Sequence, residues 1–547
     1  MKKRILACIV FMAVLCTAFP AFAEIISNET TGVSCGAHLA WEYDTETKIL
    51  TISGTGKMSD FDSSSTGMLA PWKKDEDAKN LEKVVISEGV TTIGDNAFFE
   101  CDNLISVTIP NSVISIGMGA FSYCRNLTDI KIPDGVKIIG SGAFEKCISL
   151  TDITIPRNVT DIGEYAFSDC DELKKVTIQY GVKSIGEYAF YYCGNLGEIT
   201  LPDSVINIGV NAFYQTPYYS SIPEWDVLYI GNHFIAANQE ISGAYTVESG
   251  TKTIADHAFF GCENLTSITI PQSVVSIGSR AFDNCNSLNS ITIPKSVTNI
   301  GDCAFYTCFG LESINVAADN TAYCSENGVL YNKEKTEIIR FPKEKQGTSF
   351  TIPNSVASIA AGAFKDCCKL TTILIPNRVK NIGDDAFNTC KGLTGVKIPD
   401  GVESIAKGTF FNCSGLTSVT IPQTVTSIGE NAFGKCKNFD IYYIGSQDDW
   451  NKIQGSNLLN NNIYYRSGIK ATVSDDGKII VEPINIEKMK TVILAFYNGD
   501  KLVEMQSGRY DGTGITFKST KDYTRAKAMV WESLESILPV CDAKNIE

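Results

Sequence analysis

The sequence predicts an α/β repeat solenoid, with a parallel sheet on its concave face, followed by a small all-β sandwich. A 23-residue pattern recurs along most of the chain, and each copy contains the apolar and polar alternation typical of a strand with one buried face. The repeats end near residue 466, where short alternating stretches take over. With 547 residues, 44% of them hydrophobic, the chain is long enough for an extended array.

The N-terminus has the features of a secretory signal peptide. Three basic residues at 2–4 precede an apolar run over 5–19, and Ala21 and Ala23 are small residues where a signal peptidase reads the chain. The run is shorter than the roughly 20 residues that span a bilayer. We therefore expect a Sec-type signal over 1–23, cleavage near Ala23, and a protein that is secreted or held at a cell surface without inserting into the membrane.

The formal net charge of −15 disfavours two classes of partner. Nucleic acids and anionic lipid surfaces attract basic faces, and this chain is acidic overall. We expect neither as a ligand. We expect instead a monomer that binds an extracellular protein or glycan.

The repeat unit reads L-x-x-I-x-I-P-x-x-V-x-x-I-G-x-x-A-F-x-x-C-x-x. Fourteen copies start at residues 81, 104, 127, 150, 173, 196, 242, 265, 288, 311, 347, 370, 393 and 416. The L-x-x-I-x-I stretch predicts one strand per copy, which the proline ends because it has no N–H for the ladder. The later apolar residues are spaced by three and four, which predicts a turn and a short helical or 3₁₀ segment. No copy can bury its apolar side chains alone, so stability must come from stacking neighbours.

These motifs resemble the leucine-rich repeats of BspA-like surface proteins, in which the L-x-x-I-x-I-P strand and the I-G-x-x-A-F turn are the hallmark. The resemblance covers roughly residues 30–466. It implies a bacterial leucine-rich-repeat solenoid at or outside a cell surface, and adhesion to host matrix or to other cells.

The sequence divides into segments around the array. Two islands interrupt the repeats, and each contains a hairpin-like pair: Val227–Ile230 with His233–Ala236, and Val329–Tyr331 with Glu337–Phe341. The predicted division is a signal peptide over 1–23, an N-terminal cap over 24–80, the solenoid over 81–438 with islands at 219–241 and 317–346, a C-terminal cap over 439–466, and the sandwich over 467–547.

The outward position between the two isoleucines forms the first candidate binding surface. It is threonine in nine of the fourteen copies. A binding face for a protein or an extended polymer is one interpretation, and the preference of threonine for exposed strands is the other. The candidates on this surface are Thr154, Thr177 and Thr200, with the charged Asp129, Lys131, Asp152 and Lys175 on or beside it.

The aromatic first island is the second candidate surface, because loops on a rigid scaffold often carry function. Tyr218, Tyr219, Trp225 and Tyr229 would stack on sugar rings or anchor a protein, although packing against the neighbouring coil explains them equally well. Arg340, in the second hairpin, completes the candidates.

Twelve cysteines share the twenty-first position of the unit. A disulfide ladder or a metal array is one interpretation, and a column of small buried thiols is the other. We expect the thiol column, because side chains that point the same way offer no tetrahedral metal cage.

We expect no enzyme, cofactor or metal. The chain has three histidines, and no phosphate loop is recognisable. The letters G-x-S-x-G around Ser34 lack the strand and helix that expose a nucleophile. The resulting prediction is a secreted or cell-surface protein that binds protein partners through its concave sheet and rim hairpins. The alternatives are a polysaccharide-binding protein and a structural spacer of the cell envelope without a ligand.

Overall fold

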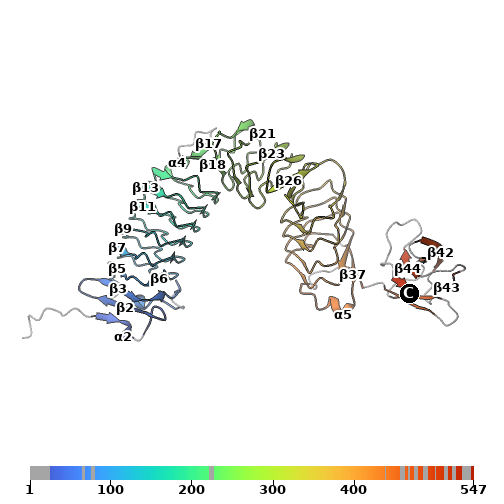
Figure 1. Ribbon diagram of the computed structural model, residues 1–547, viewed down its shortest axis with the longest axis horizontal. Helices are drawn as coiled ribbons and strands as arrows, with labels where there is room; N and C mark the ends of the chain where they lie inside the picture. The colour runs from blue at the N-terminus through green and yellow to red at the C-terminus, as the bar shows by residue number, and fades with distance from the viewer. Residues whose placement is uncertain are drawn as a thin grey trace, which may run out of the picture. The chain divides into compact units, whose positions relative to one another are not determined.

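The computed structural model (Figure 1) describes residues 25–31, 33–63, 68–74, 80–220, 227–437, 439–455, 462–465, 468–473, 479–484, 491–498, 501–509, 515–519, 525–531 and 544–546. The chain divides into two compact units. Unit 1 contains residues 1–287 and 294–305, and unit 2 contains residues 288–293 and 306–547. The predicted signal peptide lies outside the described residues.

Unit 1 begins with an antiparallel meander that leads into the parallel array. Strand β1 (Ile25–Ser27) pairs with β2 (Leu39–Asp44), which pairs with β3 (Ile49–Gly54), and β3 then pairs in parallel with β5 (Lys83–Ile86). Beside it, the short helix α3 (Pro71–Lys74) buries Trp72, whose ring stacks 5.3 Å from that of Phe98, the first phenylalanine of the repeats. The meander and α3 thus cover the apolar end of the stack, as expected for a cap.

The L-x-x-I-x-I stretches form parallel strands in 23-residue register. After β5 come β7 (Ser106–Thr108) and β9 (Asp129–Ile130), and then a three-stranded sheet of β11 (Asp152–Ile155), β13 (Lys175–Ile178) and β15 (Glu198–Thr200). Figure 1 shows β5, β7, β9, β11 and β13 following one another along one edge of unit 1. The predicted strand of each repeat is present in these copies. Its place on a concave face stays a prediction.

Each coil also contributes a second strand, so the prediction of one strand per repeat was wrong. A second parallel sheet contains β4 (Gly56–Lys57), β6 (Val90–Ile93), β8 (Ser115–Ile116), β10 (Ile138–Ile139), β12 (Asp161–Ile162), β14 (Ser184–Ile185) and β16 (Asn207–Ile208). Except for β4, these strands hold the isoleucine of I-G. Because coils stack at the distance between paired strands, this stretch finds its hydrogen-bond partners in the adjacent coil.

The A-F-x-x-C segment forms consecutive turns, so the expected helical or 3₁₀ segment is also wrong. Within a coil, the Ala120 N–H donates to Gly117 at 3.3 Å, while between coils the Phe121 N–H donates to Ala143 at 2.8 Å. Alternate N–H groups therefore bond to the next coil, and a continuous helix would remove these bonds. The helices assigned in the described residues have four residues each, so the fold is a parallel β-solenoid of the leucine-rich-repeat type rather than an α/β one.

The core consists of columns of equivalent side chains. The phenylalanine column of unit 1 is fully buried, its successive rings lie 5.1–5.6 Å apart, and their planes agree within 10° from Phe98 to Phe213. The glycine of I-G permits close stacking here. A Cβ on Gly163 would lie 2.5 Å from the backbone carbon of Gly140. Neighbouring coils approach this closely only because the side chain is absent.

The first island of unit 1 holds the predicted hairpin. Strands β17 (Val227–Ile230) and β18 (His233–Ala237) are antiparallel, and β18 continues into parallel pairing with β20 (Thr253–Ile254), β22 (Ser276–Ile277) and β24 (Asn299–Ile300). The helix α4 (Pro217–Ser220) precedes the hairpin. Strands β19 (Gly243–Thr246) and β21 (Leu265–Thr269) pair in parallel and resume the strands that the L-x-x-I-x-I stretches form, which we call the first type of strand.

Unit 2 repeats the same architecture around the second island. The predicted hairpin is present as β27 (Val329–Asn332) and β28 (Glu337–Arg340), with β26 (Tyr323–Glu326) on its other side. Parallel strands continue from it as β30 (Ser358–Ile359) and β32 (Asn381–Ile382), and as the pair β34 (Ser404–Ile405) and β36 (Ser427–Ile428). The first type of strand is seen in β23 (Ser290–Ile293), β25 (Ser313–Val316), β29 (Ser349–Thr351), β31 (Thr372–Leu374), β33 (Gly395–Lys397), β35 (Ser418–Pro422), β37 (Asp440–Ile444) and β38 (Ile463–Tyr465).

The last residues contain two antiparallel sheets. One holds β39 (Gly468–Val473), β40 (Ile479–Ile484) and β43 (Ile515–Phe517), and the other holds β41 (Thr491–Asn498), β42 (Lys501–Arg509), β44 (Arg525–Trp531) and β45 (Lys544–Ile546). These are the strand-rich elements that the sequence predicts for this region. Their packing into a sandwich stays a prediction.

Candidate functional site

The threonine surface predicted from the repeats lies on the solvent-exposed face of the strands that the L-x-x-I-x-I stretches form, which we call the first sheet. Thr154 pairs in register with Thr177, which pairs with Thr200, while the isoleucines and valine that flank Thr154 and Thr177 are buried in the core. Thr154 and Thr200 are exposed, and Thr177 is half-buried. The three hydroxyl groups therefore stand side by side on adjacent strands.

Two of the charged candidates, Asp152 and Lys175, lie on the same three-stranded sheet as the threonines. Lys175 lies in register between Asp152 and Glu198, and its Nζ is 2.8 Å from Glu198 Oε2. This hydrogen bond raises the pKa of Lys175 and lowers the pKa of Glu198. Asp129 and Lys131 are exposed on the coil before them. The sheet face thus carries alternating charges beside its hydroxyl groups.

The aromatic candidates of the first island hold internal contacts. The Tyr218 hydroxyl donates to the Gly197 carbonyl and accepts from the Ile199 N–H, both at 3.0 Å. It therefore satisfies two backbone hydrogen-bonding groups at the edge of β15. The Tyr229 hydroxyl accepts from the Glu248 N–H at 3.0 Å. Tyr219 packs edge-on against Tyr214, and burial raises the pKa of its phenol. Trp225 lies outside the described residues.

Arg340 is buried, with 5% of its surface exposed. Its guanidinium donates to the carbonyls of Gly362 and Tyr306 in neighbouring coils. The side chain therefore joins the second hairpin to the stack, and this burial does not fit the ligand-binding role predicted for it.

The repeated cysteines form the buried thiol column. Cys124, Cys147, Cys170 and Cys193 are fully buried, and each thiol lies 3.1–3.2 Å from the carbonyl oxygen of a phenylalanine 26 residues earlier, to which it donates. Burial raises the pKa of every one of them. The sixteen cysteines in the described residues are thiols rather than disulfides, and no group of three or more metal-ligating side chains is present in that part of the chain.

An aromatic ridge on the turn side of unit 1 was not predicted from the sequence. We call it the tyrosine ridge, and it consists of Tyr165, Tyr188, Tyr191, Tyr192, Tyr214 and Tyr219. Neighbouring rings are 4.4–5.8 Å apart and alternate between stacked and edge-on contacts. Tyr165 and Tyr192 are 40% and 46% exposed. The detectable signal was aromatic residues recurring 23 positions apart on either side of A-F, as in Tyr165 and Tyr188 or Tyr191 and Tyr214.

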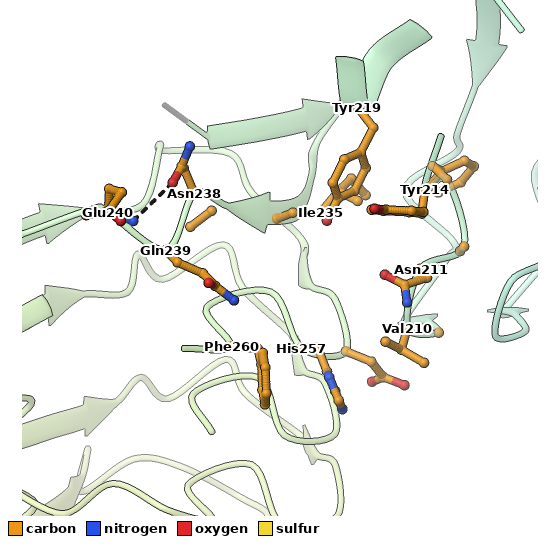
Figure 2. Close-up of a pocket in the computed structure, with 16 residues that line it drawn as sticks. Val210, Asn211, Tyr214, Tyr219, Ile235, Asn238, Gln239, Glu240, His257 and Phe260 are labelled. Atoms are coloured by element: carbon orange, nitrogen blue, oxygen red, sulfur yellow. Dashed lines mark hydrogen bonds between the residues drawn. The ribbon is translucent and has the colours of Figure 1, made fainter. Parts of the chain in front are cut away.

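The ridge ends at a cavity of about 500 Å³, which we call the island cavity. The first island replaces one coil here and supplies no A-F-x-x-C turn, so a gap opens in the turn side of the stack. Tyr214 and Tyr219 lie on one side of the gap and His257 and Phe260 on the other (Figure 2). His257 and Phe260 occupy the repeat positions that Tyr188 and Tyr191 occupy earlier, and their rings stack 5.1 Å apart.

The polar lining of the island cavity comprises amides and carboxylates. Asn211, Asn238, Gln239, Glu240 and Asp256 line it, and the sixteen described lining residues include no lysine or arginine. Burial raises the pKa of Asp256 to about 6, even though its carboxylate accepts the Ser279 N–H at 2.6 Å. Burial also lowers the pKa of His257. At neutral pH the cavity therefore combines aromatic rings with hydrogen-bonding groups and a negative charge.

The repeat model of a known family covers most of the array. The BspA type leucine rich repeat region matches over residues 76–179, 114–242, 241–347 and 340–463, which together span more than half of the chain. The chain belongs to the BspA-type leucine-rich-repeat family. No curated protein sequence matches it.

Three solved structures of bacterial proteins are similar over most of this chain. A leucine rich cell surface protein from Faecalibacterium prausnitzii A2-165 is 26% identical over 80% of this chain and 98% of its own, with a TM-score of 0.37. A leucine-rich repeat protein from Bacteroides ovatus ATCC 8483 is 24% identical over 79% and 98%, with a TM-score of 0.28. The pneumococcal vaccine antigen PcpA is 16% identical over 80% and 98%, with a TM-score of 0.28.

In the described residues, no helix has the length and hydrophobicity needed to cross a bilayer. Ser34 exchanges hydrogen bonds with the backbone of Gly36 in the N-terminal cap, and no histidine is among its hydrogen-bond partners. The arrangement of this serine is that of a local turn.

Proposed function

We propose that the mature chain acts outside the cell, either secreted or held at the cell surface. There it binds an extracellular protein through the solvent-exposed face of its first sheet. Membership of the BspA-type family supports the location. The observation that carries the binding proposal is the in-register face of β11, β13 and β15, with its row of threonine hydroxyls beside alternating charges.

The chemistry of this face favours a protein over a small ligand. A sheet held by hydrogen bonds between its strands changes little on binding, so little conformational entropy is lost. Hydroxyl groups and charges of both signs match the polar rim of protein interfaces and steer a partner by charge. The buried Arg340 and the internally bonded Tyr218 and Tyr229 shift the proposal away from the rim hairpins and toward the sheet.

Binding of residues 24–547 to immobilised extracellular-matrix proteins tests the proposal. We compare the native protein with a Lys131→Ala/Lys175→Ala variant and with the matched control Lys137→Ala/Lys183→Ala. Both pairs remove two exposed lysines from the same two coils. In the first pair Lys175 lies in β13 and Lys131 directly follows β9, whereas the control lysines directly precede β10 and β14 of the second sheet. We expect saturable binding that the first variant weakens about tenfold, mainly through slower association, and that the control leaves unchanged.

Equal weakening by both variants would show a general charge effect and contradict the proposed face. Silence of the native protein on every matrix protein would favour the structural spacer, which needs no ligand.

A further inference from the structure

We propose that the island cavity and the tyrosine ridge form a second binding site, which takes a neutral oligosaccharide. One sugar residue occupies the cavity between Tyr214 and Phe260, and the chain continues along the ridge toward Tyr165. This site lies on the turn side of the coils and uses none of the residues of the first-sheet face, so it stands apart from the protein-binding proposal.

The size and walls of the cavity suit a sugar residue. Its volume of about 500 Å³ lies in the range of small-molecule sites. Tyr214 and Tyr219 on one side, and His257 and Phe260 on the other, place rings on two sides of the same space (Figure 2). A pyranose ring presents C–H groups on its faces and hydroxyls at its edge. Aromatic rings and polar tips together match this arrangement.

The polar groups of the cavity match hydroxyls rather than anions. The amides of Asn211 and Gln239 form no side-chain hydrogen bond within the described part of the chain, so their donors and acceptors are available to a ligand. Asp256 and Glu240 add acceptors, and no basic side chain is among the described residues of the lining. A phosphate, sulfate or uronate would meet negative charge without a compensating lysine or arginine. The lining therefore selects a ligand without negative charge.

The ridge supplies the extension that a chain of sugars needs. Tyr214 stacks on Tyr191 at 5.8 Å, and Tyr188 stacks on Tyr165 at 4.8 Å, so aromatic surface leads away from the cavity across three coils. Its exposed members, Tyr165 and Tyr192, keep about half of their surface in solvent, whereas the phenylalanine column beneath them is fully buried. The core therefore does not depend on these rings. A polymer that lies along them gains contact area at small entropic cost, because each tyrosine has few rotatable bonds.

Calorimetric titration of residues 24–547 with purified hexasaccharides tests the site. The neutral probes are the hexamers of β-1,4-glucose, β-1,4-xylose, β-1,4-mannose and β-1,4-N-acetylglucosamine, and hexagalacturonate is the anionic comparison. The variants are Phe260→Ala, Tyr214→Ala and Gln239→Ala. The matched control is Phe309→Ala, which also removes a half-exposed ring from the turn side of a coil, since Phe260 and Phe309 are 40% and 44% exposed.

We expect at least one neutral hexamer to bind, with affinity at least tenfold weaker in Phe260→Ala and unchanged in Phe309→Ala. Gln239→Ala keeps the test decisive if Tyr214→Ala fails to fold, because the Gln239 side chain is exposed. Three outcomes overturn the proposal: no neutral hexamer binds, hexagalacturonate binds more tightly than all of them, or neutral binding survives both Phe260→Ala and Gln239→Ala.

Discussion

Removing one ring from the phenylalanine column tests whether stacking between coils stabilises this fold. Phe167 is fully buried, and its ring lies 5.1 Å from Phe144 and 5.3 Å from Phe190. A buried Phe→Ala substitution costs about 3–5 kcal/mol through lost transfer energy and the cavity that remains. Each stacked pair adds about 0.5–1.5 kcal/mol, and two pairs are lost here. We expect Phe167→Ala to lower the free energy of unfolding by at least about 4 kcal/mol.

The loss should also spread to the adjacent coils, because each coil contacts only its neighbours. Amide hydrogen exchange read by mass spectrometry would show it as reduced protection over residues 127–195, with smaller changes near residue 300. Phe260→Ala is the control, since a ring that is 40% exposed should cost about 1 kcal/mol or less. The reasoning is refuted if the two variants lose equal stability, or if exchange increases only at Phe167 itself.

Three further predictions concern cysteine, charge and glycine. Cys368 is exposed, so a maleimide should label it before any thiol of the buried column, and peptide mass mapping would identify the labelled residue. Rapid labelling of Cys170 in the folded protein would contradict the buried thiol column. Burial raises the pKa of Asp256 from 3.8 to about 6, so between these pH values the folded chain keeps a proton that the unfolded chain releases. The free energy of unfolding should therefore fall by up to about 3 kcal/mol as pH rises from 4 to 6. Asp256→Asn should flatten that part of the Tm-against-pH curve, and an unchanged slope would argue against it. Gly163→Ala should lower Tm by more than about 4 °C, because the added Cβ would meet the Gly140 backbone. Gly194→Ala is the control and should leave Tm nearly unchanged, because the space around its Cβ is open.

The repeat period determined which side chains are buried. Leucine, isoleucine, phenylalanine and cysteine at fixed positions predicted the columns, the strand of L-x-x-I-x-I and the buried thiols, and short apolar stretches within the islands predicted the two hairpins. These features follow from local pattern, because a side chain that recurs at the same position of every coil meets its equivalent in the next coil. The family could be recognised for the same reason.

Tertiary structure alone decided how the backbone between the columns is bonded. Apolar spacing of three and four fits a helix and a chain of turns equally well, and the bonds from Phe121 to Ala143 and its equivalents select the turns. The second sheet arises in the same way, since its two-residue strands exist only where another coil supplies the partner groups. Burial of Arg340 and the bonds of Tyr218 likewise depend on residues at least 19 positions away. The island cavity exists because the island coil lacks the A-F-x-x-C turn that both neighbouring coils have. A missing turn leaves a cavity only when the coils on either side of it are stacked.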